Sequence, residues 1–186
     1  MLNEKLNCED LILNIEQIDK NFTIEKIINN WKKIEVLSGE CDIIKPVEVY
    51  LEIKKFSDEI ELTGKVKTRL RMECSKCLEE VILDIQNDIN CTYIFEKEEY
   101  FNKKTEHLNV LDNLVYYNSN IINLTERVIE AIILSIPETP LCNENCKGLC
   151  TICGKNLNED NSHYCEKDYV DPRFEELLKL IEKEEK

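Results

Sequence analysis

The chain has 186 residues and a formal net charge of -14 at pH 7, because 38 acidic residues outnumber 24 Lys and Arg. This length fits one domain with an appendage or two small domains, and it is enough to bury a core. The acidic balance argues against a protein that holds nucleic acid through its overall charge, since phosphate binding depends on Lys and Arg. Any contact with RNA must therefore come from a local basic patch.

The sequence shows no address for export or membrane insertion. Its first residues include Glu4, Glu9 and Asp10 and no long apolar run, which argues against a secretory signal. No stretch approaches the roughly 20 apolar residues of a membrane span. We therefore expect a cytoplasmic protein without membrane contacts, in a compartment where thiols stay reduced and clustered cysteines are typical metal ligands.

The N-terminal half is predicted to be rich in strands. The first 40 residues mix the strand and helix periods, and we expect β structure there. From 46 to 56 apolar and polar residues alternate, and the same period of two recurs over 59–74 and 79–95. Short connections between these runs predict an antiparallel meander, in an arrangement that could be barrel-like.

A helix is predicted to follow the sheet. The polar stretch 97–120 is interpreted as a long connection with room for a strand over 109–116. Asn123 with Glu126 three positions later forms a capping-box pattern, and an apolar face then continues until Pro137. Such a helix would lie across the sheet.

A second helix is predicted at the C-terminal end, where Asp171 can cap it and Pro172 can occupy its first position. The fold class expected is α+β: an antiparallel sheet, one packed helix, a zinc-stapled C-terminal loop and a terminal helix. The expected division is a β-rich domain with its helix over 1–140 and a cysteine-rich metal-binding loop with the terminal helix over 141–186.

Five of the ten cysteines lie within 142–165. Cys150 and Cys153 precede Gly154 in a C-x-x-C-G pattern, in which two thiolates can reach one ion while the glycine relieves the tight turn. A closed tetrahedral zinc site needs two more ligands. We expect the upstream pair, Cys142 and Cys146, because this choice makes the site local.

Cys165 and then His163 are the reserve ligands, downstream across a loop of suitable length. The expectation is one Zn²⁺ per chain. Because protein would supply every ligand, no position would be left for water or substrate, so the site predicts a structural role and not catalysis. Free buried thiols are the simpler alternative, although free cysteines rarely cluster in this way.

An iron–sulfur cluster is a second alternative for the same loop. Cys146, Cys150 and Cys153 have the C-x-x-x-C-x-x-C spacing of clusters that serve radical-generating cofactors. That chemistry normally uses an α/β barrel of about 200 residues or more after the motif. Only 33 residues (186 minus 153) follow Cys153, which argues against it. An electron-transfer cluster stays open, because thiolates suit zinc and iron–sulfur alike.

Cys74 and Cys77 form another C-x-x-C pair, at a turn between two predicted strands. Alone the pair offers half a zinc site, so a partner pair would have to come from elsewhere in the fold. A redox pair would need a helix start that lowers one thiol pKa, which a turn between strands does not supply. Structural packing, a shared metal site and redox chemistry are the three interpretations.

A row of basic residues precedes this pair. Lys65, Lys67, Arg69 and Arg71 share one face of a predicted strand, and Lys76 extends the row. This row, which we call the basic row, is a candidate contact for RNA or another partner. The competing interpretation is a solvated face that forms cross-strand ion pairs, with Glu48 and Glu52 or with Glu59 and Glu61.

Several motifs of this chain, taken together, resemble those of a known protein family. The CSKCL segment, with Cys74 and Cys77, follows the basic strand, and a helix ending at Ile136 and Pro137 follows later. CKGLCTICGKNLNE and the closing DPRFEELLKL complete the set. In combination they resemble the YceD family, which is named for large ribosomal RNA subunit accumulation, and the resemblance covers the chain from about 45 to 181.

The resemblance implies a non-catalytic bacterial cytoplasmic factor needed for normal levels of large-subunit (23S) ribosomal RNA, in ribosome assembly. Its implied partner is ribosomal RNA or a large-subunit assembly intermediate, with no small-molecule substrate. Asp171, Pro172 and Arg173 match the C-terminal motif of the family, while Cys74 and Cys77 match its central motif, without an assigned role.

The chain departs from the family pattern at two places. Relatives commonly have arginine where this chain has Lys76, which weakens any expectation of a bidentate contact there. Relatives with the cysteine loop often show C-x-C where this chain has His163 and Cys165, so the downstream ligands are the less secure.

Two other classes of function compete with this expectation. A zinc-containing interaction adaptor would use its acidic surface to recruit a basic ribosomal protein. An iron–sulfur or thiol redox protein is the other alternative. An enzyme has the least support, because His107 and His163 are the only histidines and neither lies in a recognisable nucleophile or acid/base arrangement.

Overall fold

The computed structural model describes residues 11–18, 21–36, 39–57, 59–95, 113–160 and 162–165. These residues form, in chain order, β1 (Ile12–Asn14), the 3₁₀ helix η2 (Ile15–Gln17), β2 (Asn21–Ile28), β3 (Lys33–Val36), β4 (Gly39–Ile43), β5 (Val47–Lys55), β6 (Glu59–Glu73), β7 (Glu80–Phe95), β8 (Leu114–Tyr117), β9 (Ile121–Asn123) and the helix α2 (Thr125–Leu134).

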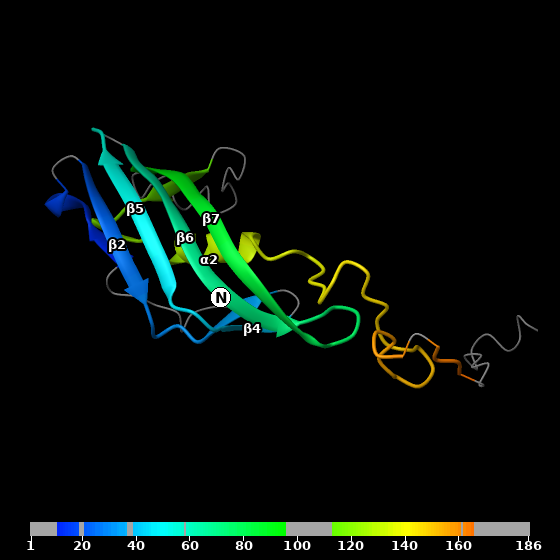
Figure 1. Ribbon diagram of the computed structural model, residues 1–186. Helices are drawn as coiled ribbons and strands as arrows, with labels where there is room; N and C mark the ends of the chain where they lie inside the picture. Colours follow the sequence, from blue (N-terminus) through cyan, green and yellow to red (C-terminus); the bar gives the residue numbers. More distant parts are fainter. Residues whose placement is uncertain are drawn as a thin grey trace, which may run out of the picture.

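Seven strands form a mostly antiparallel sheet built around the long hairpin of β6 and β7 (Figure 1). One edge of β6 pairs with β5 over its first half and with β4 near its end, while β7 occupies the whole of the other edge. β2 pairs with β5, β3 pairs with β4, and β8 joins β7 as the parallel exception. The predicted meander of 46–95 is therefore confirmed.

The alternation seen in the sequence decides which face of this sheet is buried. On β5, Val47, Val49, Leu51 and Ile53 are buried while the residues between them are more exposed. The same pattern continues along β6 and β7, because successive side chains of a strand point to opposite faces. The sheet therefore has one apolar face and one open face, and the four basic residues of β6, Lys65, Lys67, Arg69 and Arg71, lie on the open face.

The helix α2 covers part of the apolar face, where it contacts β6 and β7 (Figure 1). Val128, Ile129 and Ile132 point into the core, as the apolar periodicity predicted. The capping differs in detail, because Asn123 Oδ1 accepts a hydrogen bond from the amide of Thr125 at 2.9 Å and the helix begins after Leu124. No helix in the described ranges is long and apolar enough to cross a membrane.

The barrel-like closure that we considered is wrong, because the sheet stays open. Its ends do not pair with each other within the described residues, and β1 pairs with β9 in a separate two-stranded ladder. The physical reason is that α2 shields apolar side chains on the buried face, so the sheet does not have to close on itself.

The chain after α2 leaves the sheet and runs to the tip of the β6–β7 hairpin (Figure 1). There the amide of Ser75 donates to the carbonyl of Pro140 at 2.8 Å. The predicted C-terminal helix lies outside the described residues. The division of the chain at 140/141 stays a prediction.

Candidate metal centres

The turn between β6 and β7 holds the first cysteine pair in a tight knuckle, residues 74–79. The amide of Cys74 donates to the carbonyl of Glu79 at 2.8 Å, and the amide of Leu78 donates to the carbonyl of Cys74 at 3.0 Å. Leu78 closes this turn with a φ of 63°. This backbone conformation is energetically unfavourable for any residue that has a side chain. The turn thereby holds two sulfurs on one side.

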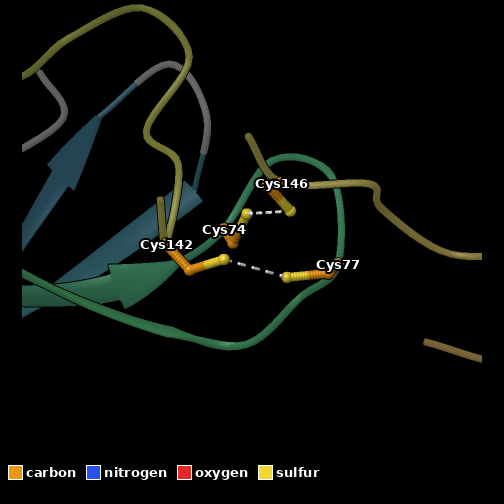
Figure 2. A group of neighbouring side chains, drawn as sticks. All are labelled: Cys74, Cys77, Cys142 and Cys146. Atoms are coloured by element: carbon orange, nitrogen blue, oxygen red, sulfur yellow. Dashed lines mark hydrogen bonds between the residues drawn. The ribbon is translucent and has the colours of Figure 1, made fainter. Parts of the chain in front are cut away.

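Cys142 and Cys146 bring the other two sulfurs to this knuckle (Figure 2). Cys74 Sγ lies 3.7 Å from Cys146 Sγ, and Cys77 Sγ lies 3.5 Å from Cys142 Sγ. Cys74, Cys77 and Cys146 are buried and Cys142 is half-buried. We call these four residues the inner cluster.

A second cluster lies further along the same loop. Cys150 Sγ is 3.6 Å from Cys165 Sγ, while His163 Nε2 is 3.2 Å from Cys153 Sγ and 3.3 Å from Cys165 Sγ. Cys153 is exposed and the other three are half-buried. We call these four residues the outer cluster; its C-x-x-C-G segment forms a second knuckle, residues 150–155.

The predicted quartet of Cys142, Cys146, Cys150 and Cys153 does not converge on one point. The structure divides it, because Cys142 and Cys146 join the first knuckle while Cys150 and Cys153 join the reserve ligands Cys165 and His163. The expectation of a single site per chain is therefore corrected to two clusters that could each hold a metal ion. The same division separates Cys146 from Cys150 and Cys153, so the three-cysteine iron–sulfur motif is not assembled.

The spacing in both clusters fits a tetrahedral ion with sulfur ligands. A Zn–S bond of about 2.3 Å places two sulfurs of a tetrahedron about 3.8 Å apart. The sulfur pairs here are separated by 3.5, 3.6 and 3.7 Å. Four sulfurs, or three sulfurs and an imidazole nitrogen, are also donor sets that structural zinc sites use. Each cluster could therefore hold a metal ion without a large rearrangement.

Both knuckles stabilise negative charge on their first sulfur. Burial raises the pKa of Cys74, but amide donors led by that of Cys77 outweigh it and lower the value to about 6. The amides of Cys153 and Ile152 lower the pKa of Cys150 to about 6. A hydrogen bond from Asn158 is the main cause that lowers the pKa of Cys146. Since thiolates and not thiols bind metals, this preorganises the ligands.

Three other cluster sulfurs, those of Cys77, Cys142 and Cys165, have a raised pKa. Burial is the main cause that raises the pKa of Cys77 to about 12. Hydrogen bonding with Cys153 is the main cause that raises the pKa of Cys165 to about 12. Each cluster thus combines a sulfur whose pKa is lowered with a sulfur whose pKa is raised, and metal binding would release the protons that the ligands still carry.

The basic row is largely ion-paired on the open face of the sheet. Arg69 forms a bidentate pair with Asp84 at 2.6 and 3.0 Å. Arg71 reaches Asp42 at 3.2 Å and Glu80 at 3.6 Å. The partners are these three acids, not the glutamates that we had considered, because the register places Asp84 opposite Arg69 and Asp42 opposite Arg71.

Two lysines of the row are less engaged. Lys65 approaches Asp88 at 3.9 Å, and Lys67 has no ion pair within the described residues. Lys76 lies apart in the first knuckle, where its Nζ donates to the carbonyl of Cys146 at 3.5 Å. The structure therefore separates Lys76 from the basic row and assigns it to the surroundings of the inner cluster.

The sequence did not single out two residues that contribute to the inner cluster and its surroundings, Asn158 and Gly148. Asn158 belongs to the loop that carries the outer cluster, residues 150–165, which we call the outer loop. Its Nδ2 donates to Cys146 Sγ at 3.4 Å, so a residue of the outer loop touches the inner cluster. Gly148 has a φ of +75°, and a Cβ there would lie 3.1 Å from the carbonyl oxygen of Lys76. The available signal was their presence in the CKGLCTICGKNLNE segment. The predicted motif residues Asp171, Pro172 and Arg173 lie outside the described residues.

Comparison with known families decides the relationship. Residues 62–181 match the profile of the family described as "Large ribosomal RNA subunit accumulation protein YceD". The chain belongs to the YceD family. The matched region contains all eight residues of the two clusters, so the clusters are part of the YceD-like region and not of an unrelated extension.

Individual relatives are distant. An uncharacterised protein of Mycobacterium tuberculosis is 28% identical over 135 residues, which cover 73% of this chain and 62% of that protein. The plant relatives named "Large ribosomal RNA subunit accumulation protein YCED homolog 1, chloroplastic" are 43% identical over 44 residues in Zea mays (24% of this chain, 15% of that protein) and 23% identical over 135 residues in Arabidopsis thaliana (61% of this chain, 42% of that protein).

The chain thus spans less than two thirds of the mycobacterial relative's length. No solved structure matches the chain.

Proposed function

We propose that this protein is a non-catalytic accessory factor for the accumulation of large-subunit (23S) ribosomal RNA, acting in ribosome assembly in the cytoplasm. The observation that supports this is the family match over 62–181, together with the plant relatives that are named for large ribosomal RNA subunit accumulation. Its partner is ribosomal RNA or a large-subunit assembly intermediate.

Each cluster holds one Zn²⁺ in this proposal. Cys74, Cys77, Cys142 and Cys146 would hold one ion, and Cys150, Cys153, His163 and Cys165 the other. With four protein ligands each, the ions have no open position for a substrate, and they stabilise the arrangement of the loop at the hairpin tip. Elemental analysis of protein purified without added metal tests this, with two zinc ions per chain expected. Iron with sulfide, or no metal, would contradict it.

The most direct test of the function is crosslinking in cells, followed by sequencing of bound RNA and identification of bound proteins. Large-subunit ribosomal RNA or its assembly intermediates are expected among the partners. A partner set without ribosomal components would contradict the function.

The contribution of the basic row to RNA binding can be measured separately. Each phosphate contact adds about 0.9 to the slope of log affinity against log salt on a duplex. Lys65 and Lys67 are the stronger candidates, because Arg69 and Arg71 are already paired with acids. Changing both lysines to Ala should lower the slope by about 1.8 on ribosomal RNA fragments. The Arg69→Ala, Arg71→Ala double variant is the matched comparison, and an unchanged slope in both would remove this row from the RNA interface.

A cleft beside the inner cluster supports a second candidate, an adaptor for a basic ribosomal protein. Its volume is about 610 Å³, and its charged lining residues are four acids and two bases. Glu73 in this cleft has no ion pair among the residues described, and Leu78, which also lines the cleft, is 60% exposed. An acidic cleft with an apolar neighbour suits a Lys- or Arg-rich segment. If this candidate is correct, Glu73→Gln should weaken capture of a basic ribosomal protein, whereas Lys67→Ala should not.

A further inference from the structure

The outer loop supplies a hydrogen-bond donor to the inner cluster. Asn158 lies between the second knuckle and His163, yet its Nδ2 donates to Cys146 Sγ at 3.4 Å. Its Oδ1 accepts a hydrogen bond from the backbone amide of Lys147 at 2.9 Å. The side-chain oxygen must therefore face Lys147, which leaves the NH₂ group facing the sulfur. The orientation of this amide is therefore fixed by two different partners.

The backbone around Asn158 is attached to the first knuckle. The amide of Leu149 donates to the carbonyl of Lys76 at 3.2 Å, and Leu149 pairs with Asn156 in an antiparallel bridge. Leu157 donates its amide to the carbonyl of Gly148 at 2.9 Å. Gly148 lets this segment lie close to Lys76, because a Cβ at position 148 would be 3.1 Å from the Lys76 carbonyl oxygen. The loop between the two clusters is thus a short hairpin packed on the inner cluster.

The same short hairpin ends at the ligands of the outer cluster. The second knuckle begins at Cys150, directly after Leu149, and His163 and Cys165 follow Asn158. Asn156 also donates to Glu79 Oε1 at 3.0 Å, which adds a side-chain contact to the first knuckle. Any ion that fixes the outer ligands therefore also restricts the segment that positions Asn158.

We propose that the outer centre completes the inner one: Asn158 is a positioning residue for Cys146, and the two clusters bind metal with positive coupling. This inference rests on the proposed binding of a metal ion by each cluster. Its physical basis is that partners which hydrogen-bond to a ligand atom orient it, and their loss typically reduces metal affinity by about 10- to 100-fold.

Positive coupling has a thermodynamic consequence that makes it testable from both sides. If an ion in the outer cluster raises the affinity of the inner cluster by some factor, an ion in the inner cluster must raise the affinity of the outer cluster by the same factor. A one-sided effect would mean damage to folding and not coupling between the centres.

The experiment is a Co²⁺ titration of the metal-free full-length chain, in which a four-sulfur centre and a three-sulfur, one-nitrogen centre give separable absorption spectra. Asn158→Asp keeps the shape and the acceptor for Lys147 but removes the donor to Cys146. We expect it to lower Co²⁺ affinity at the inner cluster by about 10- to 100-fold and to shift the sulfur-to-cobalt band of that cluster. Asn158→Ala should lower the affinity in the same direction.

Two control variants separate this effect from a general one. Asn90→Asp introduces the same change at an exposed position on β7, and it should alter neither centre. Asn143→Asp removes another donor to the inner cluster, since Asn143 Nδ2 lies 3.4 Å from Cys142 Sγ, but Asn143 is outside the outer loop. Asn143→Asp should therefore weaken the inner cluster whether or not the outer cluster can bind metal.

Removal of the outer cluster provides the decisive comparison. The Cys150→Ser, Cys153→Ser double variant should bind one Co²⁺, at the inner cluster, with reduced affinity. Adding Asn158→Asp to it should cause little further loss, because the segment is no longer fixed, whereas adding Asn143→Asp should cause its full loss. The matching Cys74→Ser, Cys77→Ser variant should weaken the outer cluster by the same factor as the outer double variant weakens the inner cluster.

The outcomes distinguish this inference from the proposed zinc binding. If the native chain binds no metal, both fail. If it binds two ions but the outer double variant or Asn158→Asp leaves inner affinity unchanged, the coupling is contradicted while two metal centres stand. Fluorescence of Trp31, which is buried in the hydrophobic core, reports whether each variant remains folded. If Asn158→Asp does not fold, Asn158→Ala takes its place in the same comparison.

Discussion

The two knuckles are built alike but depend on different parts of the molecule. In each, the amide of the first cysteine donates at 2.8 Å to a carbonyl five residues later, from Glu79 in the first knuckle and Lys155 in the second. In each, the residue after the second cysteine has a positive φ, 63° at Leu78 and 74° at Gly154. The same backbone solution therefore serves both C-x-x-C pairs.

The difference lies in where the other two ligands originate. The outer cluster takes all four ligands from residues 150–165, whereas the inner cluster joins the β6–β7 turn to residues 65 and 72 positions further along the chain. A metal in the outer cluster would therefore act directly only on its own loop, and would influence the inner cluster only through contacts such as that of Asn158 with Cys146. A metal in the inner cluster would also attach that loop to the sheet. Two similar sequence motifs can therefore have different structural roles.

The largest effect is expected from breaking the inner cluster. Cys77→Ser should abolish metal binding there and release 141–165 from the hairpin tip, because one missing thiolate opens the tetrahedral set. Hydrogen exchange should show lost protection at the amides of Ser75 and Leu149, which donate across the two segments. The sheet should persist, as reported by Trp31 fluorescence. Global unfolding would show that the inner cluster is central to the fold.

The outer cluster should give a smaller and more local effect. His163→Ala should remove one of the two ions and increase exchange within 150–165, while the amide of Ser75 stays protected. Mass spectrometry under native conditions can count the ions that remain. Loss of both ions in this variant would show that the centres cannot form separately.

A matched pair of substitutions compares the two turns directly. Gly154→Ala places a side chain at a φ of 74° without a steric clash, so backbone strain of about 1 to 2 kcal/mol should destabilise the second knuckle. Leu78→Gly relieves similar strain in the first knuckle, partly offset by about 0.5 to 1 kcal/mol of added chain entropy. Chelator competition should therefore weaken metal binding in the first variant and leave it unchanged or slightly stronger in the second.

The smallest effect is a difference in acid sensitivity: the sheet should resist a fall in pH further than metal binding by the two clusters does. The hydrogen bond from Arg69 lowers the pKa of Asp84 below its usual value of 3.8, so the stability from this pair is present above that pH and is lost only as pH falls through the lowered pKa. Protons should displace metal from thiolates and imidazole at higher pH. A metal-release dye should therefore respond before Trp31 fluorescence changes. Arg69→Gln should alter sheet stability slightly near neutral pH and less at the acid end.

Much of the sheet and the helix could be predicted from residue periodicity. Alternation along 46–95 identified β5, β6 and β7, and the apolar face with its capping residues identified α2. Closure of the sheet could not be predicted, because it depends on what covers the apolar face. The pairing of Arg69 with Asp84 depends on the register of β6 with β7, which the β6–β7 turn determines, and the pairing of Arg71 with Asp42 depends on the register of β4 with β6.

All eight cluster residues were identifiable as candidate ligands, but their grouping was not. The preference for a local site combined Cys142 and Cys146 with Cys150 and Cys153, because these pairs are neighbours in sequence. The correct partner of Cys142 is Cys77, 65 positions away, and such a contact is set by tertiary structure. Asn158 could not be distinguished from an ordinary loop asparagine, because its role depends on the sulfur that it contacts.

The 65-residue separation between Cys77 and Cys142 also has a consequence during synthesis of the chain. At about 5 to 20 residues per second, the ribosome needs roughly 3 to 13 seconds to pass from the first cysteine pair to the second. The β6–β7 hairpin can form only after β7 has been synthesised as far as Phe95, and until Cys142 and Cys146 follow it presents only two of the four inner ligands. The inner set is completed only after α2 has been synthesised, so a metal ion held by all four residues would report that the sheet strands and their covering helix have both been made.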